Sequence, residues 1–112
     1  MKRYGAVIGL DETKAEEYKA LHAAVWPEVL AMIRACHIRN YSIYLQRLDD
    51  GRLYLFSYFE YTGDDYDADM ARMAADPMTQ RWWSACMPCQ RPLENRASGE
   101  WWASMDEVFH AD

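Results

Sequence analysis

The chain has 112 residues, and 51% of them are hydrophobic, which is enough apolar material for one domain with its own core across residues 1–112. Eighteen acidic against twelve basic residues give a formal net charge of −6, and no run of Lys or Arg forms a basic patch, so we expect no nucleic-acid partner. No stretch approaches the roughly 20 apolar residues of a membrane span, and the apolar run at the N-terminus is too short for a signal peptide. We therefore expect a cytoplasmic protein that does not bind membranes.

The first strand is predicted at residues 3–10, where side chains of alternating character suit a pleated chain. An apolar stripe at helical spacing then predicts a helix over residues 13–36, beginning at a capping box formed by Thr13 and Glu16. Pro27 lies inside this stripe. Because proline lacks a backbone donor, we expect a kink or a restart of the helix just before it.

Two further strands are predicted at residues 38–48 and 52–61, joined by a tight turn at Asp49-Asp50-Gly51. The second of these strands is apolar on both sides, with Leu53, Leu55 and Phe59 on one face and Tyr54, Phe56 and Tyr58 on the other. One layer of helices covers only one face of a sheet. We therefore expect the sheet of an identical subunit to cover the other face in a homodimer.

A helix that ends near Asp76 is predicted next, followed by a second helix with Asp76 as its N-cap and Pro77 at its first position. Residues 94–99 form a polar loop, and residues 104–110 are predicted as a closing strand. The order β-α-β-β-α-β predicts an α+β fold, a ferredoxin-like sandwich with its helices on one face.

Tyr18, His22 and Trp26 recur at every fourth residue, so they share one stripe of the first helix. His22 is the one side chain of this stripe that exchanges a proton near neutral pH, and the doublet Trp82-Trp83 adds further aromatic surface. Aromatic walls around a titratable ring suit a neutral ligand that is rich in hydroxyl groups. The alternative is a hydrogen-bonded histidine in the core.

Three strings occur in a distinctive order: Tyr18-Lys-Ala-Leu-His22-Ala-Ala-Val-Trp26-Pro27-Glu28, Asn40-Tyr41-Ser42-Ile43-Tyr44-Leu45 and Gln80-Arg81-Trp82-Trp83. In order and spacing they resemble the L-rhamnose mutarotase family over most of the chain. The resemblance implies a dimeric α/β barrel of ferredoxin-like subunits that interconverts the α and β anomers of a 6-deoxy-L-hexose, L-rhamnose before others, without a cofactor or a metal.

The resemblance also implies a role for five residues. His22 is expected to be the proton donor, and the sugar is expected to contact Tyr18, Tyr41, Trp82 and Trp83. We hypothesise that His22 protonates the ring oxygen while a carboxylate, a tyrosine or a water accepts the proton of the anomeric hydroxyl. Tyr41 and Tyr44 lie on opposite faces of one strand, so we expect at most one of them to share the site with His22, and the resemblance selects Tyr41. Of the two adjacent tryptophans, one is expected to line the pocket while the other packs behind it.

Other functions remain open at this level. The run Cys89 to Asn95 differs from the Asn-Pro-Asp-Asn-Ser of the typical rhamnose enzyme, so L-fucose is the alternative substrate. A non-catalytic sugar-binding module and a cofactor-independent monooxygenase of the same architecture are further alternatives.

The Cys86-x-x-Cys89 spacing could mark a redox pair or part of a zinc site, but it follows a helix instead of opening one. We therefore expect these two cysteines and Cys36 to be free thiols.

Overall fold

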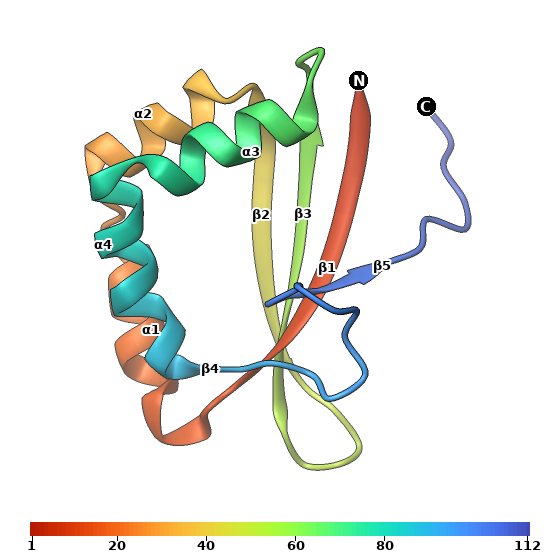
Figure 1. Ribbon diagram of the computed structural model, residues 1–112. Coiled ribbons are helices and arrows are strands. Elements are labelled where there is room, and N and C mark those ends of the chain that lie inside the picture. The colour runs from red at the N-terminus through yellow and green to blue at the C-terminus, as the bar shows by residue number, and fades with distance from the viewer.

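A five-stranded antiparallel sheet forms one layer of the protein, as seen in a computed structural model that describes residues 1–112 (Figure 1). Its strands run in the order β2-β3-β1-β4, and β5 also pairs with β1. The strands are β1 (Lys2–Leu10), β2 (Ile38–Arg47), β3 (Leu53–Tyr61), β4 (Gln90–Arg91) and β5 (Ala103–Met105).

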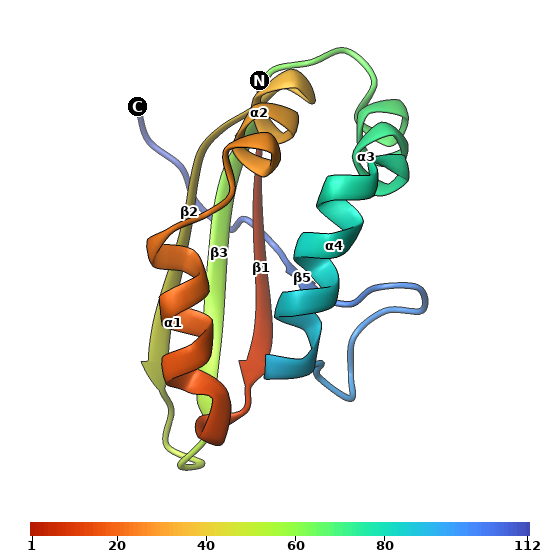
Figure 2. The ribbon, with the colours of Figure 1, turned by 90° about the vertical axis from the view of Figure 1, so that its left-hand side faces the viewer.

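Four α-helices form the second layer, and all of them lie on the same face of the sheet (Figures 1 and 2). They are α1 (Ala15–Ala23), α2 (Pro27–Ala35), α3 (Tyr66–Ala75) and α4 (Pro77–Cys86), with short 3-10 turns η1 (Glu12–Lys14) and η2 (Met87–Cys89). This is the predicted α+β arrangement of an antiparallel sheet with helices on one side. None of the helices has both the length and the hydropathy needed to cross a bilayer.

Two proline signals are confirmed. The predicted long helix is interrupted after Ala23, and α2 restarts with Pro27 at its first position, where the missing backbone donor costs no helical hydrogen bond. In the same way Pro77 begins α4, and the carboxylate of Asp76 accepts hydrogen bonds from the backbone and the hydroxyl of Thr79.

The predicted capping box at Thr13 and Glu16 is wrong. Asp11 caps the turn instead, because its Oδ1 accepts hydrogen bonds from both the backbone nitrogen and the hydroxyl of Thr13, at 2.9 and 2.7 Å. The Thr13 hydroxyl is thereby committed to Asp11, and the chain enters a 3-10 turn before α1 begins at Ala15.

The predicted hairpin is present, with Gly51 at a φ of +82° in its turn. The strand pairing also contains an irregularity that simple alternation does not predict. The register of β2 against β3 shifts between Arg39 and Ser42, and Asn40 in this bulge has a φ of +51°. Because the bulge adds one residue, both the buried Ile38 and Tyr41, three residues later, face the helices.

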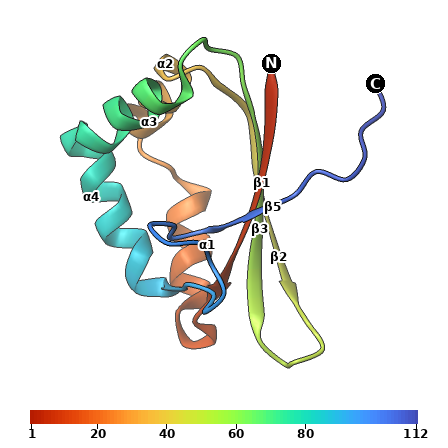
Figure 3. The ribbon, with the colours of Figure 1, turned by 45° about the vertical axis from the view of Figure 1, so that its right-hand side comes forward.

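The main core lies between the sheet and the helices, where side chains such as Ile8, Leu55 and Val29 are almost fully buried. On the opposite face of the sheet, Phe56 is paired across the strands with Val7 and Tyr44. No helix covers that face (Figure 3), and Tyr44 is 66% exposed.

The closing strand predicted for residues 104–110 is too long. β5 ends at Met105, and the last residues extend away from the sheet on the side opposite to the helices (Figure 3). Arg3 pairs with Glu107 at 2.8 Å, whereas Val108 and Phe109 are 94% and 81% exposed. The prediction failed because a strand requires a neighbouring backbone, and this segment has none within one chain.

Candidate functional site

A small aromatic cavity of about 240 Å³ lies between α1, α4, β2 and the segment from Gln90 to Trp102. Figure 2 shows α1 and α4 running along the same face of the sheet. The cavity is lined by Tyr18, His22, Tyr41, Ile43, Trp82, Trp83, Cys86, Met87, Gln90, Trp101 and Trp102. The structure thus brings all five predicted site residues to one cavity. Pockets for drug-sized ligands span about 300–1,000 Å³, so this one suits a smaller molecule of monosaccharide size.

His22 is held in a defined orientation by its own helix. Its Nδ1 lies 2.9 Å from the backbone oxygen of Tyr18, one turn earlier in α1. Because a carbonyl oxygen only accepts hydrogen bonds, Nδ1 carries the hydrogen, and Nε2 is the ring nitrogen left to exchange a proton with a ligand. The imidazole also stacks on the ring of Tyr18, with centroids 4.1 Å apart, and meets Trp82 edge-on at 5.1 Å.

Burial lowers the pKa of His22, and its hydrogen bond to the Tyr18 carbonyl opposes this effect without cancelling it. The imidazole is therefore neutral at pH 7, with a lone pair on Nε2. No Asp or Glu lines the cavity. His22 is thus the one lining side chain that titrates near neutral pH.

The hydroxyl of Tyr18 belongs to a buried polar network. Gln90 Nε2 lies 3.4 Å from Tyr18 Oη, and Gln90 Oε1 accepts a hydrogen bond from Trp101 Nε1 at 2.7 Å. Burial raises the pKa of Tyr18 far above its ordinary value, with the hydrogen bond from Gln90 acting in the opposite direction. Tyr18 therefore stays protonated at neutral pH and acts as a hydrogen-bonding group.

Tyr41 reaches the cavity from β2. Its ring packs against Phe59, with centroids 5.4 Å apart, and desolvation of its hydroxyl raises the pKa of Tyr41 to about 12. The residue as a whole is 43% exposed, so Tyr41 also reaches the surface of the protein. Tyr44 faces the other side of the sheet, away from the cavity.

Both tryptophans of the doublet line the cavity, whereas the sequence predicts that one of them packs behind the other. Trp82 is only 7% exposed and contacts His22, while Trp83 is 38% exposed and stands at the rim. Adjacent helical residues point about 100° apart, and the cavity is wide enough to span both directions. Trp26 does not line the cavity but packs against Trp82, with ring centroids 5.3 Å apart.

Sequence reasoning missed three prominent lining residues. The sequence assigned none of Gln90, Trp101 and Trp102 to the site, although all three line the cavity. These residues reach the cavity because β4 and β5 both return to the edge of β1, a pairing between distant segments. The only feature of the sequence that could have indicated these residues is the second pair of adjacent tryptophans, Trp101-Trp102.

The two cysteines of the Cys86-x-x-Cys89 spacing are buried and form no disulfide. Burial raises the pKa of Cys86 to about 12 and that of Cys89 to about 11, and Cys89 Sγ lies 3.1 Å from a carboxylate oxygen of Glu17. Redox exchange and zinc binding both require thiolates. The environment of these two thiols therefore favours neither chemistry.

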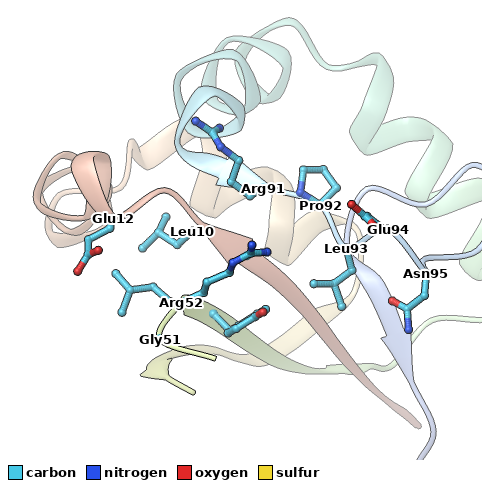
Figure 4. Close-up of a pocket in the computed structure, with 12 residues that line it drawn as sticks. Leu10, Glu12, Gly51, Arg52, Arg91, Pro92, Leu93, Glu94 and Asn95 are labelled. Atoms are coloured by element: carbon cyan, nitrogen blue, oxygen red, sulfur yellow. The ribbon is translucent and has the colours of Figure 1, made fainter. Parts of the chain in front are cut away.

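A larger and more open cleft, of about 870 Å³, lies at the hairpin end of the sheet (Figure 4). Leu10, Glu12 and Arg52 line one side of it, and residues 92–95 line the other. It contains charges of both signs and no aromatic wall other than Tyr54, and it shares no residue with the aromatic cavity. We find no arrangement in it that selects one class of ligand.

The family model and the curated relatives indicate the same family. A family model described as L-rhamnose mutarotase matches residues 3–111. The L-rhamnose mutarotases of Oceanobacillus iheyensis and Bacillus subtilis are 30% and 31% identical to this chain over 112 residues, which is the full length of each protein.

Two solved structures share the fold. The L-rhamnose mutarotase of Formosa agariphila superposes with a TM-score of 0.75 at 20% identity and covers all of both chains. The tetracenomycin F2 cyclase of Streptomyces glaucescens superposes with a TM-score of 0.67 at 18% identity and covers 99% of this chain and 96% of its own. At these identities the likeness concerns the architecture and not the chemistry.

Proposed function

This chain belongs to the L-rhamnose mutarotase family, and we propose that it interconverts the α and β anomers of L-rhamnose in the aromatic cavity. One observation carries the assignment to this cavity. His22, fixed between the carbonyl of Tyr18 and the edge of Trp82, is the one lining group that exchanges protons near neutral pH.

The reaction needs only proton transfers at two oxygens bonded to the same carbon. Neutral His22 takes the proton of the anomeric hydroxyl on Nε2, the bond between C1 and the ring oxygen breaks, and the ring oxygen receives a proton from the imidazolium. Rotation about the C1–C2 bond and the reverse sequence close the other anomer. No redox change is involved, and the protons balance.

This proposal modifies the sequence-based hypothesis on one point. His22 still donates to the ring oxygen, but it first acts as the base, because its pKa is lowered by burial. No carboxylate lines the cavity and the pKa values of Tyr18 and Tyr41 are raised, so we assign both proton transfers to His22. General acid–base catalysis by one positioned group contributes about 10²- to 10⁴-fold, roughly 3 to 5 kcal/mol.

The tryptophans supply binding surface. The C–H groups of a sugar ring stack on indole faces, and the 6-methyl group of L-rhamnose needs an apolar contact. One methyl group discriminates between ligands by only about 1–3 kcal/mol. Specificity among 6-deoxy sugars therefore comes from polar groups that meet the hydroxyls, here from Tyr18 and Tyr41.

Exchange spectroscopy by NMR tests this proposal directly. Purified protein is added to equilibrated L-rhamnose and, in parallel, to L-fucose, and the exchange cross-peaks between the two anomeric protons are integrated. Faster exchange for L-rhamnose than for L-fucose supports the proposal. Faster exchange for L-fucose would assign the alternative substrate, and ligand contact without any acceleration would show a binding module.

We also propose that a second copy of this chain covers the open face of the sheet, which would complete a dimeric barrel. The apolar side chains that one copy leaves exposed support it: Tyr44 on the sheet, and Val108 and Phe109 on the tail. Tyr44 lies on the face of the sheet that no helix covers, and the C-terminal tail that carries Val108 and Phe109 extends to that same side (Figure 3). Burying such surface contributes about 25 cal/mol per Å².

A further inference from the structure

We propose that Gln90, held by Trp101, is a positioning residue that makes the Tyr18 hydroxyl a hydrogen-bond donor toward the ligand in the aromatic cavity. The inference rests on the proposed function only for the identity of that ligand, L-rhamnose. Its structural basis is the chain of contacts from Trp101 through Gln90 to Tyr18.

The direction of the chain follows from the chemistry of its first member. An indole nitrogen only donates hydrogen bonds, so the Gln90 atom that lies 2.7 Å from Trp101 Nε1 is the amide oxygen. This fixes the orientation of the amide and leaves Gln90 Nε2 facing Tyr18 Oη. The Gln90 amide therefore donates, and the Tyr18 oxygen accepts.

The hydrogen of the Tyr18 hydroxyl then has no acceptor within the protein. Tyr18 Oη takes part in no hydrogen bond in which it donates, and the residue lines the cavity. A ligand oxygen is the partner that this geometry leaves open. Without Trp101, the Gln90 amide could turn its oxygen toward Tyr18 and take up that hydrogen itself.

The position of Gln90 agrees with such a role. The side chain is only 5% exposed, and its backbone pairs with Leu10 of β1, so its place is set by the sheet. A buried amide is costly unless both of its ends are hydrogen-bonded. Trp101 and Tyr18 meet this requirement at opposite ends of the same side chain.

A double-mutant cycle tests the proposal, with the dissociation constant of L-rhamnose measured by NMR titration and the KM and kcat of anomer exchange measured beside it. We expect Gln90→Leu and Trp101→Phe each to raise the dissociation constant about fivefold to tenfold, the size of one neutral hydrogen bond, and to raise KM more than they lower kcat. In a Tyr18→Phe background both effects should fall below twofold, because the hydroxyl on which they act is gone.

Trp102→Phe is the matched control, since Trp102 lines the same cavity and makes no hydrogen bond to Gln90. Its effect should be the same with and without the Tyr18 hydroxyl. In the sugar-free protein, Gln90→Leu should also move the indole N–H resonance of Trp101 upfield. If Gln90→Leu fails to fold, the cycle of Trp101→Phe with Tyr18→Phe tests the proposal by itself, because Trp101 lies partly at the surface.

Equal losses in the wild-type and Tyr18→Phe backgrounds would overturn the positioning role, whether or not the protein exchanges anomers. Conversely, the protein could bind L-rhamnose without accelerating exchange while the substitutions at Gln90 and Trp101 lose their effect in the Tyr18→Phe background. That result would support the positioning role and overturn only the proposed reaction. The two failures are therefore distinguishable.

Discussion

The Nδ1 atom of His22 lies 2.9 Å from the backbone oxygen of Tyr18, while the two rings stack with their centroids 4.1 Å apart. Tyr18 thus contacts His22 twice, through a carbonyl that fixes the tautomer and through a ring that stacks on the imidazole. This pairing is possible because the residues lie one helical turn apart, where side chains share a face.

The first prediction concerns pH. Because burial lowers the pKa of His22 below its ordinary value of 6.5, the exchange rate should rise with pH to a midpoint below 6.5 and be level at pH 7. The unfolded chain binds this proton more readily than the folded one, so the free energy of unfolding should fall as pH decreases through that region. Polarimetry between pH 4.5 and 8 gives the profile, and a midpoint above 6.5 would contradict it.

The two tryptophans of the doublet should differ in what they stabilise. Trp82→Ala removes a side chain that is 93% buried and should lower the free energy of unfolding by about 3–5 kcal/mol. Trp83→Ala, at the rim, should cost about 1 kcal/mol or less in stability but weaken L-rhamnose binding about tenfold. Urea unfolding and NMR titration separate the two effects, and equal losses of stability would refute the distinction.

Asp69 joins α3 to the sheet, since it accepts hydrogen bonds from the Tyr61 hydroxyl at 2.5 Å and from His37 Nδ1 at 2.9 Å. These bonds hold the pKa of Asp69 below its ordinary value, so their contribution is present above pH 4 and is lost as pH falls through the lowered pKa. Asp69→Asn should lower the urea midpoint at pH 7, and the difference from wild type should shrink in acid.

Asp67→Asn is the matched control for that substitution, since Asp67 lies in the first turn of the same helix without these partners. It should leave the midpoint nearly unchanged. A loss as large as that of Asp69→Asn would show that charge near the helix terminus matters, and not the contacts to Tyr61 and His37.

The dimer proposal predicts that the wild-type protein sediments at twice the mass of the chain and that Tyr44→Asp shifts it to the monomer. Tyr44 is 66% exposed in one copy, so the substitution costs the isolated fold little but places a charge in the proposed interface. Leu30→Asp, at a residue of α2 that is 53% exposed, is the control and should leave the mass unchanged. A wild-type monomer at micromolar concentration would contradict the dimer.

Local signals account for most of what could be predicted from the sequence. Pro27 and the pair Asp76-Pro77 act on the backbone beside them, and the turn before Gly51 needs only its own residues, so all three were found. Where two local contacts compete, the outcome was not predicted. The helix cap was wrongly assigned to Thr13 because the Thr13 hydroxyl donates a hydrogen bond to Asp11, two residues earlier.

The candidate site shows the same division. The stripe of Tyr18 and His22 is visible in helical spacing, but Gln90 and Trp101 reach the cavity only through the pairing of β4 and β5 with β1. Nothing in the residues around Gln90 indicates that its amide is buried between an indole and a phenol.

The central claim is that Nε2 of His22 moves the proton in anomer exchange. The most direct measurement is the exchange rate of L-rhamnose anomers in the presence of His22→Gln, with its fold checked by circular dichroism and with His110→Gln, at an exposed residue of the tail, as the control. The account predicts a loss of about 10²- to 10⁴-fold for His22→Gln and a wild-type rate for His110→Gln. Wild-type exchange by folded His22→Gln would contradict it.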